Sequence, residues 1–222
     1  MLGRVSFIPT APSPRPTPLV LGYVRQEDTL LPYLSVRETL QFAAELRLPK
    51  SVSREDRLAI VEQVITELGL MDSVETFVGL LSGGQRRRVS IGCVLVTSCS
   101  VLVLDEPTTG LDSFTACRLL ETLSNLAKNG GRTVVLSIHQ PRSDAFSLVS
   151  VSLCPSGQLL TVFAQFDQCT LLSTGSVVYS GATTSLIPHF ERLGFHLEPH
   201  TNPLDFVIDV SLNFSSLASI RY

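Results

Sequence analysis

The sequence contains no long hydrophobic run, little lysine and no excess of positive charge. No stretch of about 18 apolar residues occurs in the 222 residues, so no segment of this sequence is predicted to span a bilayer. The formal net charge is -3, and only two of the 17 basic residues, Lys50 and Lys128, are lysines. This composition gives no electrostatic support for nucleic-acid binding, which favours a basic face.

Two further absences limit the chemistry that the sequence can support. The five cysteines include no C-x-x-C pair, which favours reduced thiols over disulfides or a zinc site. No glycine is followed by lysine, so the sequence lacks the G-x-x-x-x-G-K-[ST] loop, in which backbone N–H groups and a lysine hold phosphates. Any phosphate contact that this sequence makes must therefore come from segments that are not such a loop.

Hydrophobic periodicity predicts an α/β domain behind a proline-rich start. Residues 1–20 contain five prolines and no periodic pattern, which predicts a disordered leader. Strands are predicted within 21–28 and as buried runs at 101–104 and 133–138, with helices at 35–46, 53–70, 86–96 and about 113–128. This alternation predicts a largely parallel sheet, in which ligands bind at the carboxyl ends of the strands.

Polar side chains follow the predicted strands. Asp105 and Glu106 end the run VLVL, and His139 follows TVVLSI. Asp105 has the oxygen ligands that Mg²⁺ prefers, Glu106 could polarise an attacking water, and His139 could contact a terminal phosphate. Gln26, in the loop after the first strand, could offer its amide oxygen to the same metal. Alone, Gln26 is better explained as a surface glutamine and His139 can be an ordinary loop histidine. A lone Asp-Glu pair favours a solvated turn, but the following PTTGLD argues against that explanation for Asp105 and Glu106.

The stretch LSGGQ, residues 81–85, precedes a predicted helix. Gly83 and Gly84 allow backbone N–H groups to approach a phosphate closely, and the positive end of the following helix favours an anion. Ser82 can donate its hydroxyl, and Gln85 completes the stretch. A plain turn that caps a helix explains the same residues.

The order and spacing of these stretches resemble the nucleotide-binding domain of ABC transporters. The family's Q-loop, signature, Walker B, D-loop and H-loop are similar in order to Gln26, LSGGQ (81–85), VLVLDEP (101–107), GLD (110–112) and IHQ (138–140). The strings LSVRETL, RRRVSIG, GLDSFTA, HQPRSDAF and NPLDF resemble the G subfamily of White-type half-transporters, and within it the sterol-exporting sterolins.

The resemblance implies a fold, cofactors and site residues. The fold is an incomplete P-loop NTPase-type ABC cassette, an α/β domain with a largely parallel sheet and a helical signature subdomain, over residues 21–210. The cofactors are ATP and Mg²⁺. The implied catalytic residues are Glu106 and His139, the metal ligands Asp105 and Gln26, and the nucleotide contacts Ser82, Gly83, Gly84, Gln85 and Asp112.

The resemblance also implies partners. In the family each ATP lies between the Walker A loop of one subunit and the signature of the other, so a second ABC half-transporter is expected, in a homodimer or a heterodimer. The membrane would be reached at its cytoplasmic face through a transmembrane half that this sequence does not contain, and the cargo would be a lipid or sterol. Without the phosphate loop, we expect the isolated chain to bind ATP weakly and not to hydrolyse it.

Departures from the family pattern leave alternatives open. Residues 149–165 interrupt the pattern and are explained equally well as retained intron sequence or as a surface insertion, and residues 211–222 form a predicted tail. Three functions remain: the cassette of an ATP-driven lipid or sterol exporter, a non-catalytic truncated isoform that pairs with and regulates a full subunit, or a soluble ABC ATPase.

Overall fold

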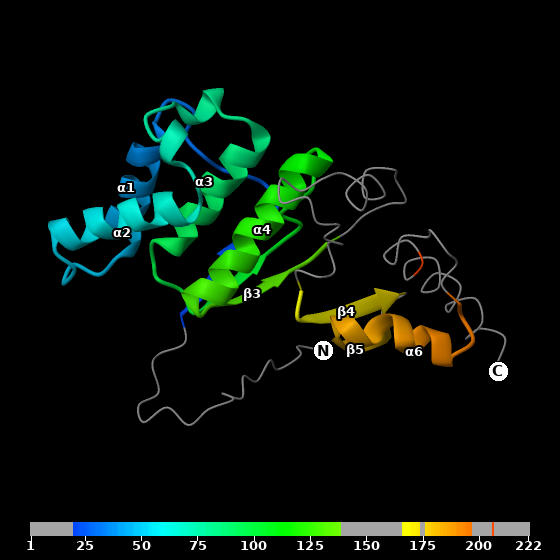
Figure 1. The fold of residues 1–222 in the computed structure, drawn as a ribbon. Helices are drawn as coiled ribbons and strands as arrows, with labels where there is room; N and C mark the ends of the chain where they lie inside the picture. Colours follow the sequence, from blue (N-terminus) through cyan, green and yellow to red (C-terminus); the bar gives the residue numbers. More distant parts are fainter. Residues whose placement is uncertain (1–19, 139–165, 174–175, 197–205, 207–222) are drawn as a thin grey trace.

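The computed structural model describes residues 20–138, 166–173, 176–196 and 206 (Figure 1). Its elements follow the order β1 (Leu21–Val24), α1 (Val36–Arg47), α2 (Arg54–Glu67), α3 (Gly83–Leu95), β2 (Val101–Leu104), α4 (Ser113–Gly130), β3 (Thr133–Leu136), β4 (Gln168–Ser173), β5 (Ser176–Ala182) and α6 (Leu186–Arg192). Single helical turns lie at Met71–Ser73, Val78–Leu80 and Thr183–Ser185. The predicted leader, insertion and tail lie outside the described residues, apart from Val20.

The three strands that precede the candidate site residues form one parallel sheet. Their order is β1-β2-β3, and β2 pairs in parallel with both neighbours. The register places Val24 opposite Leu104, and Leu104 opposite Leu136. The three strands therefore end at the same edge, and the loops that follow them start side by side, as predicted for an α/β fold.

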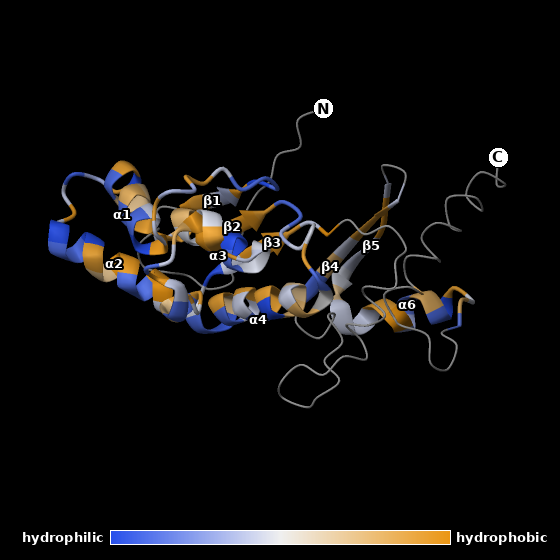
Figure 2. Ribbon diagram, turned by 90° about the horizontal axis from the view of Figure 1, so that it is seen from above, coloured by the Kyte–Doolittle hydropathy of each residue, from blue (hydrophilic) through white to orange (hydrophobic). Residues whose placement is uncertain are grey.

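One face of this sheet packs on helices. Val24, Leu102 and Leu104 are at most 2% exposed and belong to the main hydrophobic core, together with side chains of α3 and α4. Figure 2 shows the strands as mainly hydrophobic elements, and α4 with hydrophobic and polar residues alternating along its length. Such alternation at helical spacing is typical of a helix with one buried face.

The prediction that β3 is a buried strand is wrong for the described residues. Val135 is 47% exposed and Thr133 is exposed, while Val134 and Leu136 are half-buried and pack against the core. The physical reason is that β3 is the last strand of this sheet, so among the described residues it pairs only with β2 and has α4 on one face.

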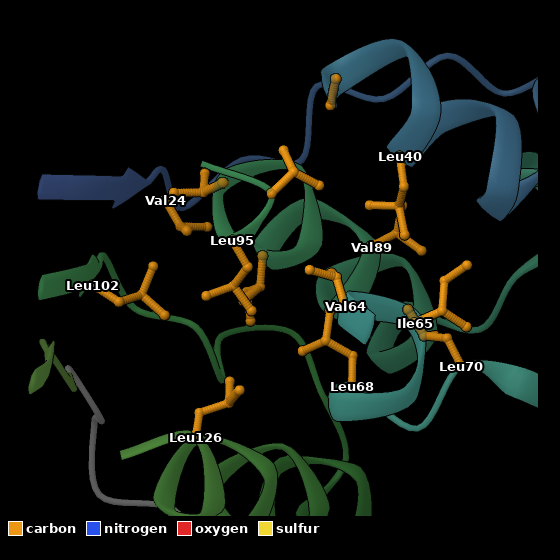
Figure 3. Packing of buried hydrophobic residues seen from close by; sticks show 14 of the residues in the cluster. Val24, Leu40, Val64, Ile65, Leu68, Leu70, Val89, Leu95, Leu102 and Leu126 are labelled. Carbon is orange, nitrogen blue, oxygen red and sulfur yellow. The ribbon is translucent and has the colours of Figure 1, made fainter. Parts of the chain in front are cut away.

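The helices before β2 form a subdomain around α3. Figure 1 shows α1 and α2 on one side of α3, and α4 and the strands on the other. Figure 3 shows Leu40, Val64 and Leu68 converging in this core. A Cβ at Gly92 would lie 2.8 Å from Leu40 Cδ2 and 3.0 Å from Leu68 Cδ1, so glycine permits the close approach of α3 to α1 and α2.

Local capping explains where these helices begin. Ser35 and Glu38 form the predicted capping box at the start of α1, with the Ser35 N–H donating to Glu38 Oε2 at 2.8 Å. Ser53 caps α2 by accepting the Asp56 N–H at 3.1 Å. Both caps supply acceptors for N–H groups that have no partner within the helix.

The last elements form a smaller unit with its own core. Strands β4 and β5 pair as an antiparallel hairpin, and α6 follows. Tyr179, Leu186, Phe190 and Phe206 form a second buried cluster there. No helix in the described ranges is long and apolar enough to cross a bilayer.

Candidate functional site

The carboxyl ends of β1 and β2 bring Gln26 into direct contact with Glu106. Gln26 Nε2 donates to Glu106 Oε2 at 2.9 Å, and the hydroxyl of Thr109 donates to the same oxygen at 2.9 Å. These two donors hold the Glu106 side chain at the strand edge. The contact uses the amide nitrogen of Gln26, which leaves its amide oxygen, the predicted metal ligand, outside this bond.

The carboxylate of Asp105 accepts hydrogen bonds from two hydroxyls. Tyr23 donates to Oδ2 at 3.1 Å and Ser137 to Oδ1 at 2.8 Å. The bond to the negative carboxylate raises the pKa of Tyr23, because loss of the phenol proton would bring two negative charges together. Sequence reasoning missed Tyr23 and Ser137, although pairing of their strands with β2 would have placed both beside Asp105.

The backbone of Glu106 adopts a conformation that is uncommon for a residue with a side chain. Its φ is 41°, in the left-handed region, and its N–H donates to the Ser137 hydroxyl at 2.9 Å. Non-glycine residues in this region are infrequent and concentrate at functional sites, where surrounding contacts maintain the strain. Ser137 therefore orients both acidic residues of the site.

A buried arginine of α3 connects the loops that follow β1 and β2. Arg87 of α3 is 3% exposed, and its Nη2 donates to the Asp105 carbonyl at 2.9 Å. Its Nη1 donates to the carbonyls of Arg25 at 2.6 Å and Gln26 at 3.1 Å. Nη1 also pairs with Asp28 Oδ1 at 2.9 Å. Sequence reasoning did not single out Arg87 within the string RRR.

The signature segment, residues 81–85, forms the start of α3. Ser82 is the N-cap residue, and its hydroxyl accepts the Gln85 N–H at 3.3 Å. In return, Gln85 Oε1 accepts the Ser82 N–H at 3.0 Å, which completes a capping box. Gly83 and Gly84 occupy the first turn, whose N–H groups have no backbone acceptor within the helix. Such a turn can bind an anion.

Asp112 lies next to the signature segment as the N-cap residue of α4. Its Oδ1 accepts the Thr115 N–H at 3.0 Å and its Oδ2 accepts the Thr115 hydroxyl at 2.6 Å. These hydrogen bonds lower the pKa of Asp112, because they favour the carboxylate. A Cβ at Gly84 would lie 2.1 Å from Thr115 Cγ2, so the two helix starts are in close contact.

The predicted residues thus fall into two neighbouring groups. Gln26, Asp105 and Glu106 lie at the strand edge, while the signature segment and Asp112 lie at the starts of α3 and α4. The loop that leaves Glu106 reaches Asp112 six residues later and so connects the groups. His139 lies outside the described residues.

The strand-edge group suits a hard divalent cation that also binds water or substrate oxygens. Asp105 supplies carboxylate oxygens, and the amide oxygen of Gln26 lies outside the bond to Glu106 and is available as a second ligand. Within the described ranges no three His, Cys, Asp or Glu side chains converge on one point that could hold a metal ion. Mg²⁺ commonly binds through one or two carboxylates together with water and substrate phosphates, so these residues fit Mg²⁺ better than a metal enclosed by protein ligands.

Comparison with protein families matches residues 9–109 to the family described as ABC transporter. The human ATP-binding cassette sub-family G member 8 is 44% identical over 204 residues, which cover 90% of this chain and 28% of that protein. The uncharacterized ABC transporter ATP-binding protein/permease YOL075C of Saccharomyces cerevisiae is 43% identical over 198 residues, covering 87% of this chain and 14% of that protein.

A third relative and two solved structures give similar matches. The broad substrate specificity ATP-binding cassette transporter ABCG2 of Mus musculus is 41% identical over 216 residues, covering 95% of this chain and 30% of that protein. The chain therefore spans less than a third of each of these relatives. The structure of cbiO1 from Clostridium perfringens matches with a TM-score of 0.60 and 25% identity, over 79% of this chain and 62% of that one. A putative metal-chelate type ABC transporter shares the fold with a TM-score of 0.58 and 23% identity, over 76% of this chain and 60% of that one.

Proposed function

This chain belongs to the ABC transporter family as an ATP-binding domain related to the G subfamily, and from that premise we propose that it is the ATPase cassette of a lipid or sterol exporter. The contact of Gln26 Nε2 with Glu106 Oε2 is the observation that supports the ATPase part of the proposal. The contact joins an amide and a carboxylate that are 80 positions apart in the sequence and follow β1 and β2, at one edge beside Asp105.

Each residue of the strand-edge group has a separate task in this proposal. Asp105 and the amide oxygen of Gln26 would hold Mg²⁺, which would supply positive charge to the phosphates of ATP. Glu106 accepts a proton from the attacking water. Thr109 and Gln26 fix the Glu106 side chain for that transfer. His139 contacts the terminal phosphate.

The signature segment and Asp112 act on ATP held by a second half-transporter. The first-turn N–H groups of α3 and the Ser82 hydroxyl donate to phosphate oxygens across the dimer interface. In the arrangement that the family uses, the phosphate loop facing these groups belongs to the other subunit. Attachment to the cytoplasmic face of a membrane, and a lipid or sterol cargo, rest on the resemblance to the G subfamily.

A second candidate function has an observation in its favour. The capping box at Ser82 and the cap at Asp112 are complete, while the sequence contains no Gly-Lys pair. A chain with these features could complete a partner's ATP site without a working site of its own. It would then act as a non-catalytic isoform that pairs with a full subunit and regulates it.

Co-expression with a complete G-subfamily half-transporter, such as mouse ABCG2, tests both functions. We expect the chain to co-purify with this partner in Mg²⁺ and ATP, and the pair to hydrolyse ATP faster than the partner alone. Because this sequence has no phosphate loop beside Glu106, the added hydrolysis should occur on ATP held by the partner, and Ser82→Ala should lower it, whereas Glu55→Gln, an exposed position in the first turn of α2, should not.

A matched pair of cap variants tests the role of the signature segment. Ser82→Ala and Ser53→Ala each remove one serine N-cap, at a cost of about 1 kcal/mol. Only Ser82→Ala should weaken the ATP-dependent association. Association that lowers the partner's ATP hydrolysis would favour the regulatory isoform, and no association in ATP would contradict both functions.

A further inference from the structure

Three consecutive arginines in α3 have three different sets of partners. Arg86 donates to the Leu81 carbonyl at the start of its own helix, at 3.2 Å. Arg88 donates to the carbonyls of Leu68 and Gly69 at the end of α2, at 3.1 and 3.2 Å. Both side chains thus donate to backbone carbonyls at helix ends within the helical subdomain. Arg87 alone among the three reaches the strand-edge group.

The Arg87 guanidinium joins three elements that carry functional residues. It belongs to the helix that begins at the signature segment, and it binds the loop that carries Gln26 and the carbonyl of Asp105 at the end of β2. A guanidinium is planar and presents its donors in a fixed fork, so it transmits orientation as well as charge. A lysine ammonium, as a compact point charge, cannot reproduce this fork.

Burial makes this connection strong. Arg87 is 3% exposed, and its partner Asp28 has a side chain that is 19% exposed. Hydrogen bonds to a charged group are stronger than neutral ones, and weak screening in the interior preserves the ion pair. Movement of α3 without the Gln26 loop would leave a buried charge without acceptors, which is costly.

We propose that Arg87 is a positioning residue that couples the signature end of α3 to Gln26 and to the acidic residues at the end of β2. Nucleotide contact at Ser82–Gln85 reorients α3, and the guanidinium carries that movement to the Gln26 loop and to the Asp105 carbonyl. This inference rests on the proposed function, because it assigns regulation to the same ATP site.

The test compares Arg87→Lys with Arg86→Lys in the full chain. Both variants keep a positive charge and lose a guanidinium from adjacent positions of one helix. Asp28→Asn serves as a second variant, because it removes only the charged partner of Arg87 and keeps an oxygen acceptor. Because this change is smaller, Asp28→Asn still tests the proposal if Arg87→Lys prevents folding.

Amide hydrogen exchange measured by NMR reports the coupling without requiring ATP. The probes are three N–H groups at the strand ends: Asp105 to the Val24 carbonyl at 3.0 Å, Glu106 to the Ser137 hydroxyl at 2.9 Å, and Ser137 to the Leu104 carbonyl at 3.1 Å. Reference N–H groups in the helical subdomain are those of Leu48 and Leu68, each bonded at 3.0 Å.

We expect Arg87→Lys to raise exchange at the strand-end probes by roughly tenfold or more, as loss of charge-assisted bonds to a buried guanidinium implies. The reference N–H groups should keep wild-type rates, Asp28→Asn should give a smaller rise at the same probes, and Arg86→Lys none. Unchanged exchange at the probes in Arg87→Lys would overturn the proposal. So would an equal rise at probes and references, because Arg87 would then serve only global stability.

Steady-state hydrolysis in the assembly with mouse ABCG2 separates this inference from the proposed function. Arg87→Lys should lower kcat for ATP by about tenfold and change KM by less than about twofold, because it disturbs the alignment of catalytic groups and not the binding of nucleotide. Equal kcat values for Arg87→Lys and Arg86→Lys would overturn the coupling. If the wild-type assembly hydrolyses ATP no faster than mouse ABCG2 alone, the proposed function fails, and the exchange measurement still decides whether Arg87 couples these segments.

Discussion

The contact between Gly84 and Thr115 allows a prediction in which one substitution destabilises the protein and a second one relieves the clash. Gly84 is buried where the starts of α3 and α4 meet, and a Cβ added there would lie 2.1 Å from Thr115 Cγ2. Ordinary van der Waals contacts begin at 3.4 Å, so Gly84→Ala requires a displacement of about an ångström. Thr115 cannot rotate away cheaply, because its hydroxyl donates to Asp112 Oδ2 at 2.6 Å.

The magnitude follows from two opposing terms. Insertion of a methyl group into a tightly packed contact costs about 1–3 kcal/mol. Replacement of glycine by alanine within a helix returns up to about 1 kcal/mol. We therefore expect Gly84→Ala to lower the free energy of unfolding by about 1–2 kcal/mol. Thr115→Ser keeps the hydroxyl and removes Cγ2, so alone it should cost no more than about 1 kcal/mol.

A double-mutant cycle in urea, followed by helical circular dichroism, measures the contact itself. In the double variant the new Cβ would lie 3.6 Å from the Cβ at position 115, an ordinary contact. Gly84→Ala/Thr115→Ser should therefore be at least as stable as Thr115→Ser, with a coupling energy of about 1 kcal/mol or more. Additive losses in the double variant, or wild-type stability of Gly84→Ala, would refute the close packing of these helix starts.

Two further predictions use titratable groups. Because hydrogen bonds from Thr115 lower the pKa of Asp112 below its usual 3.8, its stabilising contribution is complete above pH 3.8 and is lost as the pH falls through the lower pKa of the folded state. The urea midpoint should therefore fall more steeply with acid in the wild type than in Asp112→Asn, and parallel curves would contradict this. Burial raises the pKa of the Cys93 thiol from 9.0 to about 11, so at pH 8 iodoacetamide should alkylate it about a hundredfold more slowly in the folded chain than in urea. Equal rates by mass spectrometry would count against its burial.

Features that depend on neighbouring residues were predicted from the sequence. The capping box of Ser35 and Glu38 is confirmed, because both of its groups lie within one helical turn. The parallel α/β arrangement is confirmed as well, since alternating apolar runs and helices leave few other ways to cover a sheet. The order of the motifs identified the ABC transporter family, and the comparisons confirm it.

Features that depend on packing were not predicted. The run TVVL is apolar throughout, yet Val135 is 47% exposed, because exposure depends on which elements lie over a strand and not on its own composition. Tyr23 and Ser137 became part of the site only when parallel pairing placed them beside Asp105. The left-handed backbone of Glu106 is likewise maintained by a hydroxyl 31 residues away in the sequence.

The arginines at positions 86–88 show most clearly what the sequence determines and what tertiary packing determines. By itself, the sequence determined that a helix follows the stretch LSGGQ, that it carries three positive charges, and that acidic residues follow a strand. The structure starts this helix at Gly83, three residues before the predicted start at 86. The sequence did not determine which charge meets which acceptor, because adjacent positions on a helix point about 100° apart. Only the packing of α3 against β1 and α2 directed Arg87 to Gln26 and Asp105 and Arg88 to the end of α2.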